Sequence, residues 1–234
     1  KFGKAKVSLP GGCAIGTRAV DIHLFGLKKL GAKIKIKNGY IHAEAKKGLF
    51  GNNINLPSIS VGATENLIIA AVYAYGKTII KNCACEPEIK DLINFLNKMG
   101  ANIKWIGKRK IKIIGSKDFK PVNYSVMFDR IEAGTFIIAG ALIGKKIKIT
   151  GVETNIIRKE LNILRQMGVK FRIKKNEIII LHSKNIKPVS IKTEAYPGFP
   201  TDLQAQIMVL MTKAKGVSKI KENIFENRFM HVPE

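Results

Sequence analysis

The sequence predicts an α/β fold built from repeated strand–helix–strand–helix–strand–strand units. Three similar segments, with apolar residues at helical spacing, end in Gly31, Gly100 and Gly168, which lie 69 and 68 residues apart. Each glycine is followed by an alternating run, the pattern of a helix closed by a C-terminal glycine and continued by a strand. Solenoid repeats are shorter, so we expect copies of one α/β unit rather than an array.

A second set of helices follows the same period. These helices are expected to begin at 60–64, 129–135 and 200–204, to end near Gly76, Gly144 and Gly216, and to precede strands at 77–81, 145–150 and 217–221. Two complete copies of the unit and two partial ones then fit in the chain. Helix N-termini bind anions through free N–H groups and the helix dipole, so converging helix starts predict a site for a phosphorylated substrate.

Length and composition are those of a globular protein. The 234 residues, 46% of them hydrophobic, suffice for one large domain or two of ordinary size. No apolar run reaches the ~18 residues of a membrane span, and we see no signal peptide, so no membrane partner is expected. The net charge of +24 is typical of proteins that bind nucleic acids. However, the lysines are scattered and no aromatic residues interleave them, which favours a solvated basic surface and no nucleic-acid partner.

The cysteines and histidines exclude other classes of site. Cys13, Cys83 and Cys85 are odd in number and contain no CxxC pair, which argues against a disulfide scaffold or zinc site and for a reducing, cytoplasmic location. The histidines share no metal-ligand spacing, so neither a metal nor a cofactor is expected. Cys83 and Cys85 follow a strand-like run and are predicted to be core thiols.

The loop from Pro10 to Arg18 carries the clearest chemical signal. Cys13 lies in this glycine-rich stretch, five residues before Arg18. Glycines allow a backbone to approach a ligand closely. A thiol near cationic groups can act as a nucleophile or proton donor, and a guanidinium suits phosphate or carboxylate. Taken alone, a lone loop cysteine is more often an ordinary buried or surface thiol than a reactive one.

Further motifs accompany this loop, in a fixed order along the whole chain. They are Ser60-Val61-Gly62-Ala63-Thr64, Glu86-Pro87-Glu88, Asp129-Arg130-Ile131-Glu132-Ala133-Gly134-Thr135, Phe199-Pro200-Thr201-Asp202-Leu203-Gln204-Ala205-Gln206 and Phe225-Glu226-Asn227-Arg228-Phe229-Met230-His231-Val232-Pro233-Glu234. With these motifs, the chain closely resembles the UDP-N-acetylglucosamine enolpyruvyl transferase (1-carboxyvinyltransferase) family.

The resemblance implies a fold and an activity. The expected fold is a two-lobed inside-out α/β barrel of βαβαββ units, here incomplete at both ends, with residues 1–127 in the first, mobile-loop lobe and 128–234 in the second. The expected reaction transfers the enolpyruvyl group of phosphoenolpyruvate to the 3′-hydroxyl of UDP-N-acetylglucosamine with release of phosphate, the first committed step of peptidoglycan synthesis. N- and C-terminal segments of the same enzyme are the expected partners, and without them the chain is expected to be inactive.

The resemblance also implies residue roles. Cys13 would donate the proton to phosphoenolpyruvate and be alkylated by fosfomycin, while Asp202 would be the base for the sugar hydroxyl. Such an acid and base suit the chemistry, because the alkene carbon gains a proton while the hydroxyl loses one. The remaining substrate-binding residues would be Arg18, Ala19, Val20, Asp21, Ile22, Ser58, Ile59, Ser60, Val61 and Ile224.

The chain departs from the family pattern at four positions. Ala19 replaces a proline, Ser58 a lysine that often binds the nucleotide, Cys85 an arginine and Phe128 a proline. None of them is the acid or the base, but Ser58 removes a charge from the nucleotide site. Other functions stay open: 5-enolpyruvylshikimate-3-phosphate synthase, an inactive truncated remnant or a basic binding domain. Without the resemblance, Asp202 would be read as a charge favourable to a helix dipole.

Overall fold

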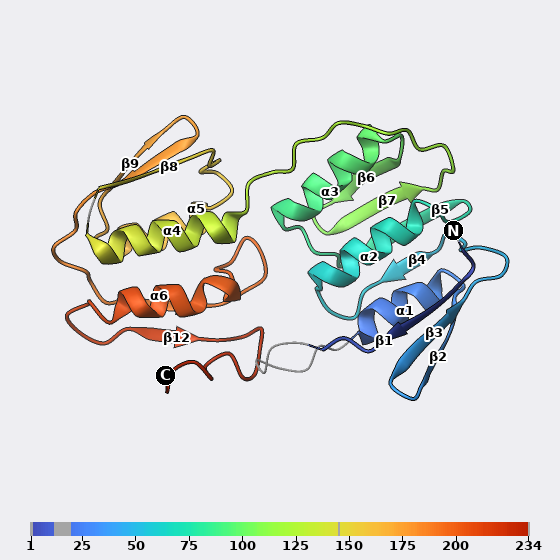
Figure 1. The fold of residues 1–234 in the computed structure, drawn as a ribbon, viewed down its shortest axis with the longest axis horizontal. Coiled ribbons are helices and arrows are strands. Elements are labelled where there is room, and N and C mark those ends of the chain that lie inside the picture. The colour runs from blue at the N-terminus through green and yellow to red at the C-terminus, as the bar shows by residue number, and fades with distance from the viewer. Residues whose placement is uncertain (1, 12–19, 145, 234) are drawn as a thin grey trace. The chain divides into compact units, whose positions relative to one another are not determined.

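The computed structural model describes residues 2–11, 20–144 and 146–233 (Figure 1). Within these ranges the chain forms two compact units, the first ending at Val126 and the second beginning at Met127. Each is described by itself below, as unit 1 and unit 2. The predicted boundary after residue 127 lies one residue from this division, and the assignment of the units to two lobes stays a prediction.

Unit 1 contains a three-stranded and a four-stranded sheet, with strand orders β1-β3-β2 and β4-β5-β7-β6. Strands β4 and β5 are parallel, whereas β5, β7 and β6 pair antiparallel. The elements, in chain order, are β1 (Lys4–Ser8), α1 (Asp21–Lys29), β2 (Lys33–Lys37), β3 (Tyr40–Glu44), β4 (Asn53–Asn55), α2 (Val61–Ala71), β5 (Lys77–Lys81), α3 (Pro87–Lys98), β6 (Asn102–Gly107) and β7 (Lys110–Ile114).

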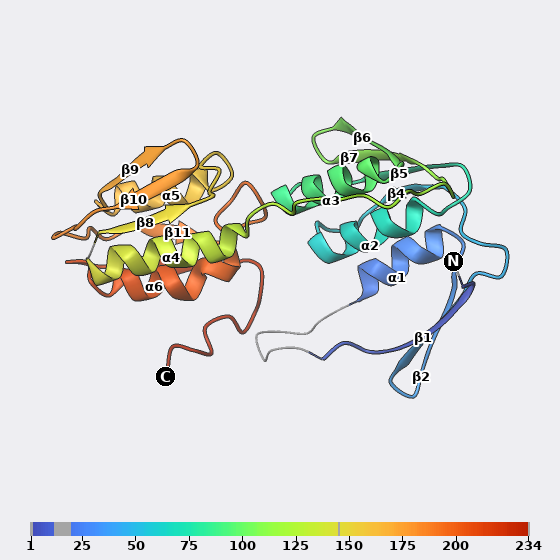
Figure 2. The same cartoon turned by 45° about the horizontal axis from the view of Figure 1, so that its top comes forward.

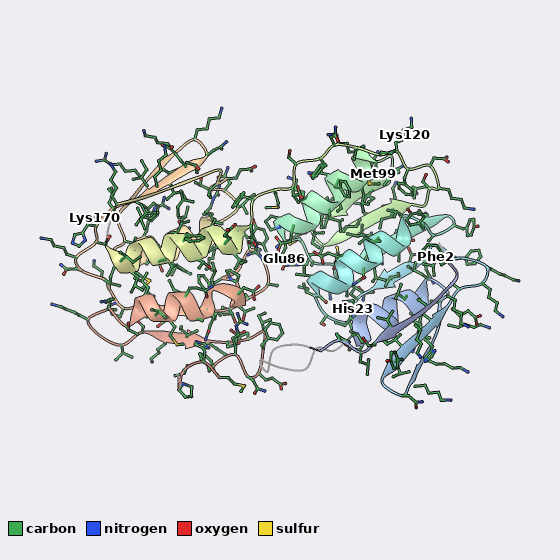
Figure 3. All side chains as sticks on the ribbon, viewed as in Figure 1. Phe2, His23, Glu86, Met99, Lys120 and Lys170 are labelled. Atoms are coloured by element: carbon green, nitrogen blue, oxygen red, sulfur yellow. The ribbon has the colours of Figure 1, made fainter. Side chains whose placement is uncertain are left out.

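The core of unit 1 lies between its helices and one face of the four-stranded sheet (Figure 2). Strand β7 alternates buried Ile111 and Ile113 with half-buried Lys110, Lys112 and Ile114, as a strand with one covered face requires. Helix α3 begins with Pro87 in its first turn, where a missing N–H costs nothing, and turns its apolar side to the sheet. At its far end the Lys120 N–H donates to the Met99 carbonyl at 2.8 Å (Figure 3).

Unit 2 repeats this design, with strand orders β8-β10-β9 and β11-β12. Strands β8, β10 and β9 are antiparallel neighbours, whereas β11 and β12 are parallel. The elements are α4 (Arg130–Ile143), β8 (Ile147–Thr150), α5 (Arg158–Gln166), β9 (Phe171–Lys174), β10 (Glu177–Ile180), β11 (Ser190–Lys192), the 3₁₀ helix η1 (Thr201–Leu203), α6 (Gln204–Met211) and β12 (Lys219–Lys221).

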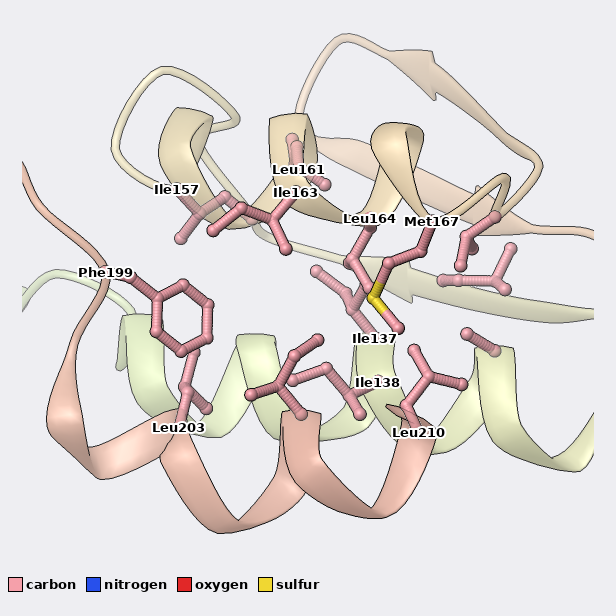
Figure 4. Packing of buried hydrophobic residues seen from close by; sticks show 14 of the residues in the cluster. Ile137, Ile138, Ile157, Leu161, Ile163, Leu164, Met167, Phe199, Leu203 and Leu210 are labelled. Carbon is pink, nitrogen blue, oxygen red and sulfur yellow. The ribbon is translucent and has the colours of Figure 1, made fainter. Parts of the chain in front are cut away.

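The core of unit 2 is formed where α4, α5 and α6 face one another (Figure 4). Leu164 of α5 and Met167, the residue directly after this helix, point toward Ile137 and Ile138 from α4, and all four are nearly or fully buried. Phe199 closes the end of this core near η1 and is 1% exposed. The two hydrophobic clusters share no residue, so each unit has its own core.

The predicted repeat is confirmed by the topology. The order β1-β3-β2 in unit 1 recurs as β5-β7-β6 and, in unit 2, as β8-β10-β9; the parallel pair β4-β5 recurs as β11-β12. Gly31, Gly100 and Gly168 follow α1, α3 and α5 with positive φ angles of 96°, 110° and 81°. These left-handed conformations favour glycine, which explains why glycine recurs at these three positions.

Two predicted helix ends need refinement. Helix α4 ends directly before Gly144, but α2 ends at Ala71 and α6 at Met211, each five residues before its glycine. In both, the next residues wind as tight turns, and Tyr75 and Ala214 then form isolated parallel bridges to Phe50 and Ile186. Pairing with a neighbouring segment therefore ends these helices early.

Candidate functional site

Helices α1 and α2 of unit 1 begin side by side, which brings together predicted residues 20–22 and 58–61. A Cβ built on Gly26 would collide with the side chain of Leu67, so glycine permits the close approach of the two helices. Nearer the helix starts, a Cβ on Gly62 would lie 3.2 Å from His23 Nε2. The structure thus gathers the described residues that are predicted to bind the nucleotide at two adjacent helix N-termini, an environment that favours anions.

The start of α2 is fixed by hydroxyl groups. Ser60 Oγ accepts the Ala63 N–H at 3.3 Å, as an N-cap residue does. Thr64, fully buried, donates to the Ser60 carbonyl at 2.7 Å and accepts the Ala84 N–H at 3.0 Å. Ser58 and Ile59 just before the cap are exposed. The cap is therefore held rigidly while the preceding loop faces outward.

The start of α3 lies beside the same end of α2. His23 and Glu86 mark the N-terminal ends of α1 and α3 in Figure 3. Burial, and then the nearby Glu88 and Glu86, raise the pKa of Glu65 on α2. Burial also lowers the pKa of His23, and the charge of Asp21 opposes this shift. These helix starts are therefore partly shielded from water, which strengthens electrostatic interactions there.

Helices α4, α5 and α6 of unit 2 also begin close together. Asp129 caps α4, accepting the Ile131 and Glu132 N–H groups at 2.7 and 3.2 Å. The buried Arg130 lies 3.9 Å from Glu160 of α5, and its guanidinium lies 5.7 Å from the Tyr196 ring centroid. Burial raises the pKa of Glu160, and the charge of Arg130 acts against that effect.

Asp202, the predicted base, lies in η1 just before α6. Its side chain is 59% exposed, and Oδ1 lies 3.5 Å from Nη2 of the largely buried Arg228. The N-cap residue of η1 is Pro200, so this carboxylate does not occupy the capping position of its helix. Asp202 is thus accessible, as a group that receives a proton from a bound substrate must be.

Sequence reasoning missed a polar cluster beside Asp202. Glu222 Oε1 accepts the hydroxyl of Thr193 at 2.8 Å and the N–H groups of Ile224 and Phe225 at 2.7 and 3.2 Å. Its Oε2 accepts the hydroxyl of Thr201 at 3.0 Å. The cluster therefore joins the segment of Ile224, the predicted nucleotide contact, to the residue preceding Asp202. No local pattern predicts it, since Glu222 is 29 residues from Thr193 and 21 residues from Thr201.

The remaining predictions concern the cysteines, the other residues of the Cys13 loop, metal binding and membrane spans. Cys13, Arg18 and Ala19 lie outside the described residues, so their roles stay predictions. Cys83 is a buried thiol, as predicted, and burial raises its pKa to about 11. Cys85 is only partly buried, so the prediction of a core position is wrong for this residue. Across the described ranges, no group of three His, Cys, Asp or Glu side chains could hold a metal ion. In the same ranges, no helix has the length and apolar character to cross a bilayer.

Comparison with known proteins identifies relatives along the whole chain. UDP-N-acetylglucosamine 1-carboxyvinyltransferase of Pelagibacter ubique is 65% identical over 234 residues, which are 100% of this chain and 56% of that protein. UDP-N-acetylglucosamine 1-carboxyvinyltransferase 1 of Clostridium acetobutylicum is 56% identical, with the same coverage. The chain thus spans about half the length of the curated relatives it matches.

Solved structures share the fold. The enolpyruvyl transferase NikO from Streptomyces tendae superposes with a TM-score of 0.89 at 23% identity, covering 100% of this chain and 56% of that one. EPSP synthase from Acinetobacter baumannii gives a TM-score of 0.63 at 19% identity, covering 93% of this chain and 51% of that one. These similarities confirm the predicted enolpyruvyl transferase fold.

The family model described as EPSP synthase (3-phosphoshikimate 1-carboxyvinyltransferase) matches residues 1–234. This match covers the full chain, including the helix starts in both units and the segment around Asp202. The chain therefore belongs to the EPSP synthase (3-phosphoshikimate 1-carboxyvinyltransferase) family.

Proposed function

We propose that this chain is the central part of a UDP-N-acetylglucosamine 1-carboxyvinyltransferase, acting in peptidoglycan precursor synthesis. The observation that carries the proposal is the shared name of the similar relatives, which are 49–65% identical over the whole chain. Paired helix starts in each unit support a phosphorylated substrate. The exposed Asp202 supports a reaction that needs a base.

The proposed chemistry is an addition followed by an elimination. The sugar 3′-oxygen bonds to C2 of phosphoenolpyruvate while Asp202 takes the hydroxyl proton and the Cys13 thiol gives its proton to C3. The resulting tetrahedral adduct then loses phosphate by breaking its C2–O bond, and the departing phosphate takes the proton held by Asp202. The Cys13 thiolate takes a proton from C3, which restores the double bond and the starting state of both groups. A thiol with an ordinary pKa near 8.5 is mostly protonated at neutral pH and can serve as the acid.

The predicted site residues have the following roles in the proposal. Val20, Asp21 and Ile22 at the start of α1, and residues 58–61 at the start of α2, hold the nucleotide sugar from unit 1. Ile224 packs on the nucleotide from unit 2, and Asp202 receives the proton. Arg18 and Ala19 complete the site beside Cys13. Units 1 and 2 are then parts of the first and second lobes.

A second candidate is 3-phosphoshikimate 1-carboxyvinyl transfer, because the family model carries that name. Both reactions use phosphoenolpyruvate and release phosphate, so they differ in the acceptor hydroxyl alone. Phosphate release should therefore be measured on the full-length protein that contains this chain, with phosphoenolpyruvate and either UDP-N-acetylglucosamine or shikimate 3-phosphate. We expect turnover with the nucleotide sugar only. Turnover with shikimate 3-phosphate only would replace the proposal with the second candidate.

A further inference from the structure

The carboxylate of Glu222 links segments of unit 2 that are distant in sequence. It receives hydrogen bonds from Thr193 just after β11, from Thr201 at the start of η1 and from the backbone of Ile224 and Phe225. Asn223 adds to the link, because its N–H donates to Thr193 Oγ1 at 2.9 Å and its side-chain amide donates to the Thr193 carbonyl at 3.3 Å. The Glu222 cluster, meaning Glu222, Thr193, Thr201 and Asn223, is therefore one connected network.

The burial of this cluster makes it a rigid connection. Thr193 is completely buried and Thr201 is 8% exposed, while Glu222 is half-buried. Hydrogen bonds to an ionised acceptor are the stronger kind, and they gain further strength away from water. The Glu222 carboxylate thus accepts four hydrogen bonds, two from backbone N–H groups and two from threonine hydroxyls. Removing it would leave all four donors without this acceptor.

We propose that Glu222 is a positioning residue that sets the geometry of Asp202 and Ile224 together. Thr201 precedes Asp202 directly, so its bond to Oε2 fixes the turn that presents the proposed base. The bonds from Ile224 and Phe225 to Oε1 fix the segment that meets the nucleotide. This inference rests on the proposed function, because it assigns both ends of the cluster to one substrate.

Variants of Thr201 and Thr193 separate the effect of Glu222 on Asp202 from its effect on Ile224. Thr201→Val removes the bond next to Asp202 and should lower kcat, with the Kd for UDP-N-acetylglucosamine largely kept. Thr193→Val removes bonds to Glu222 and to the Asn223 N–H and should raise that Kd, with kcat largely kept. Glu222→Ala removes both connections, so it should change kcat and Kd together, each by at least ~10-fold, as expected for losing bonds to a charged group.

Glu222→Gln is the conservative variant. Its amide keeps one acceptor oxygen for the Ile224 and Phe225 N–H groups, and its nitrogen can donate to the hydroxyl of Thr201. We therefore expect it to restore most of what Glu222→Ala loses. Glu153→Ala is the matched control, since Glu153 is an exposed glutamate of the same unit outside the cluster; it should leave kcat and Kd unchanged.

The experiment uses the full-length protein that contains this chain. UDP-N-acetylglucosamine binding is measured by calorimetry, turnover by phosphate release, and amide exchange at Ile224 and Phe225 by NMR or mass spectrometry. Faster exchange at these amides in Glu222→Ala, with the split between Thr201→Val and Thr193→Val, is the expected result. If Glu222→Ala proves too unstable to study, the threonine variants decide the question.

The possible failures are distinguishable. Unchanged kcat and Kd in Glu222→Ala, or in both threonine variants, would overturn the role of Glu222 while leaving the proposed function intact. A loss of thermal stability without any change in kcat or Kd would overturn it too, because the cluster would then be purely structural. An unsubstituted protein that binds no UDP-N-acetylglucosamine would overturn the proposed function, and this inference with it.

Discussion

Asp129 and Asp202 lie at the starts of two helices in unit 2, and their carboxylates have different partners. Asp129 Oδ1 accepts two N–H groups of its own helix, α4. Asp202 lies in a helical turn without a side-chain cap; its Oδ1 lies 3.5 Å from Nη2 of Arg228, and its side chain is 59% exposed. The two helix starts thus place one carboxylate in a capping role and leave the other exposed, as the proposed base requires.

The same contrast exists in unit 1. Ser60 uses its hydroxyl to cap α2, whereas α1 begins without a side-chain cap hydrogen bond. The uncapped start is the one that follows the loop with Cys13 and Arg18 in the sequence. We therefore expect the capping bonds of Ser60 and Asp129 to contribute to stability, and the carboxylate of Asp202 to contribute to the proposed chemistry. The predictions below test this division.

The largest expected effect concerns the cysteines. Fosfomycin should alkylate Cys13 completely in the full-length protein and leave Cys83 and Cys85 unmodified. Burial raises the pKa of Cys83 to about 11 and also raises that of Cys85, so neither supplies much thiolate at neutral pH. Intact-mass measurement and peptide mapping check this. A label on Cys83 or Cys85 instead would contradict the proton-donor role of Cys13.

The separate cores predict effects that stay within one unit. Leu164→Ala in unit 2 and Leu67→Ala in unit 1 each leave a cavity at a residue no more than 1% exposed. Each should lower the free energy of unfolding by about 2–5 kcal/mol. Hydrogen exchange should accelerate mainly in the unit that carries the substitution. Equal acceleration in both units would show that their cores fold as one.

The capping role of Asp129 predicts a smaller loss of stability. Asp129→Ala leaves two N–H groups of α4 without their side-chain acceptor, so unfolding should become easier by about 0.5–2 kcal/mol. Asp129→Asn should recover most of this, because asparagine caps almost as well. Denaturant melts check both variants. If Asp129→Ala is as stable as the unsubstituted protein, the hydrogen bonds from α4 to Asp129 do not stabilise the fold, and the proposed division between the two aspartates fails.

The smallest expected effect is a pH dependence in unit 1. Burial lowers the pKa of His23, so the folded protein binds this proton less readily than the unfolded chain, whose value is 6.5. Stability from the neutral imidazole is present above pH 6.5 and is lost as the pH falls toward the folded pKa. His23→Gln should therefore show a weaker decline in Tm between pH 7.5 and about pH 5.5. An identical decline in both proteins would assign the pH dependence to other groups.

Much of the fold could be predicted because its signals are local. The glycines at 31, 100 and 168 mark helix ends that need a left-handed residue, and alternating isoleucines mark strands with one buried face. The early ends of α2 and α6 could not be predicted, since they depend on bridges to distant segments. The helix starts were located correctly, including the turn that carries Asp202.

The site was less predictable because its geometry depends on contacts across long stretches of sequence. The approach of Gly26 to Leu67 and the ion pair of Arg130 with Glu160 join separate helices. Residues such as Glu222 look like ordinary surface glutamates until the fold brings Thr193 and Thr201 to them. Asp202 itself was found through the resemblance, since its residue type and position alone equally suit a dipole-stabilising charge.

The proposed role of Asp202 is tested most directly by phosphate release from the full-length protein carrying Asp202→Asn. Asn keeps the size of the side chain but cannot take the hydroxyl proton, so turnover should fall by at least ~100-fold. Calorimetry should still detect UDP-N-acetylglucosamine binding, and Asp118→Asn, at an exposed aspartate of unit 1, should keep normal turnover. Near-normal turnover of Asp202→Asn would contradict the assignment and show that another group takes the proton.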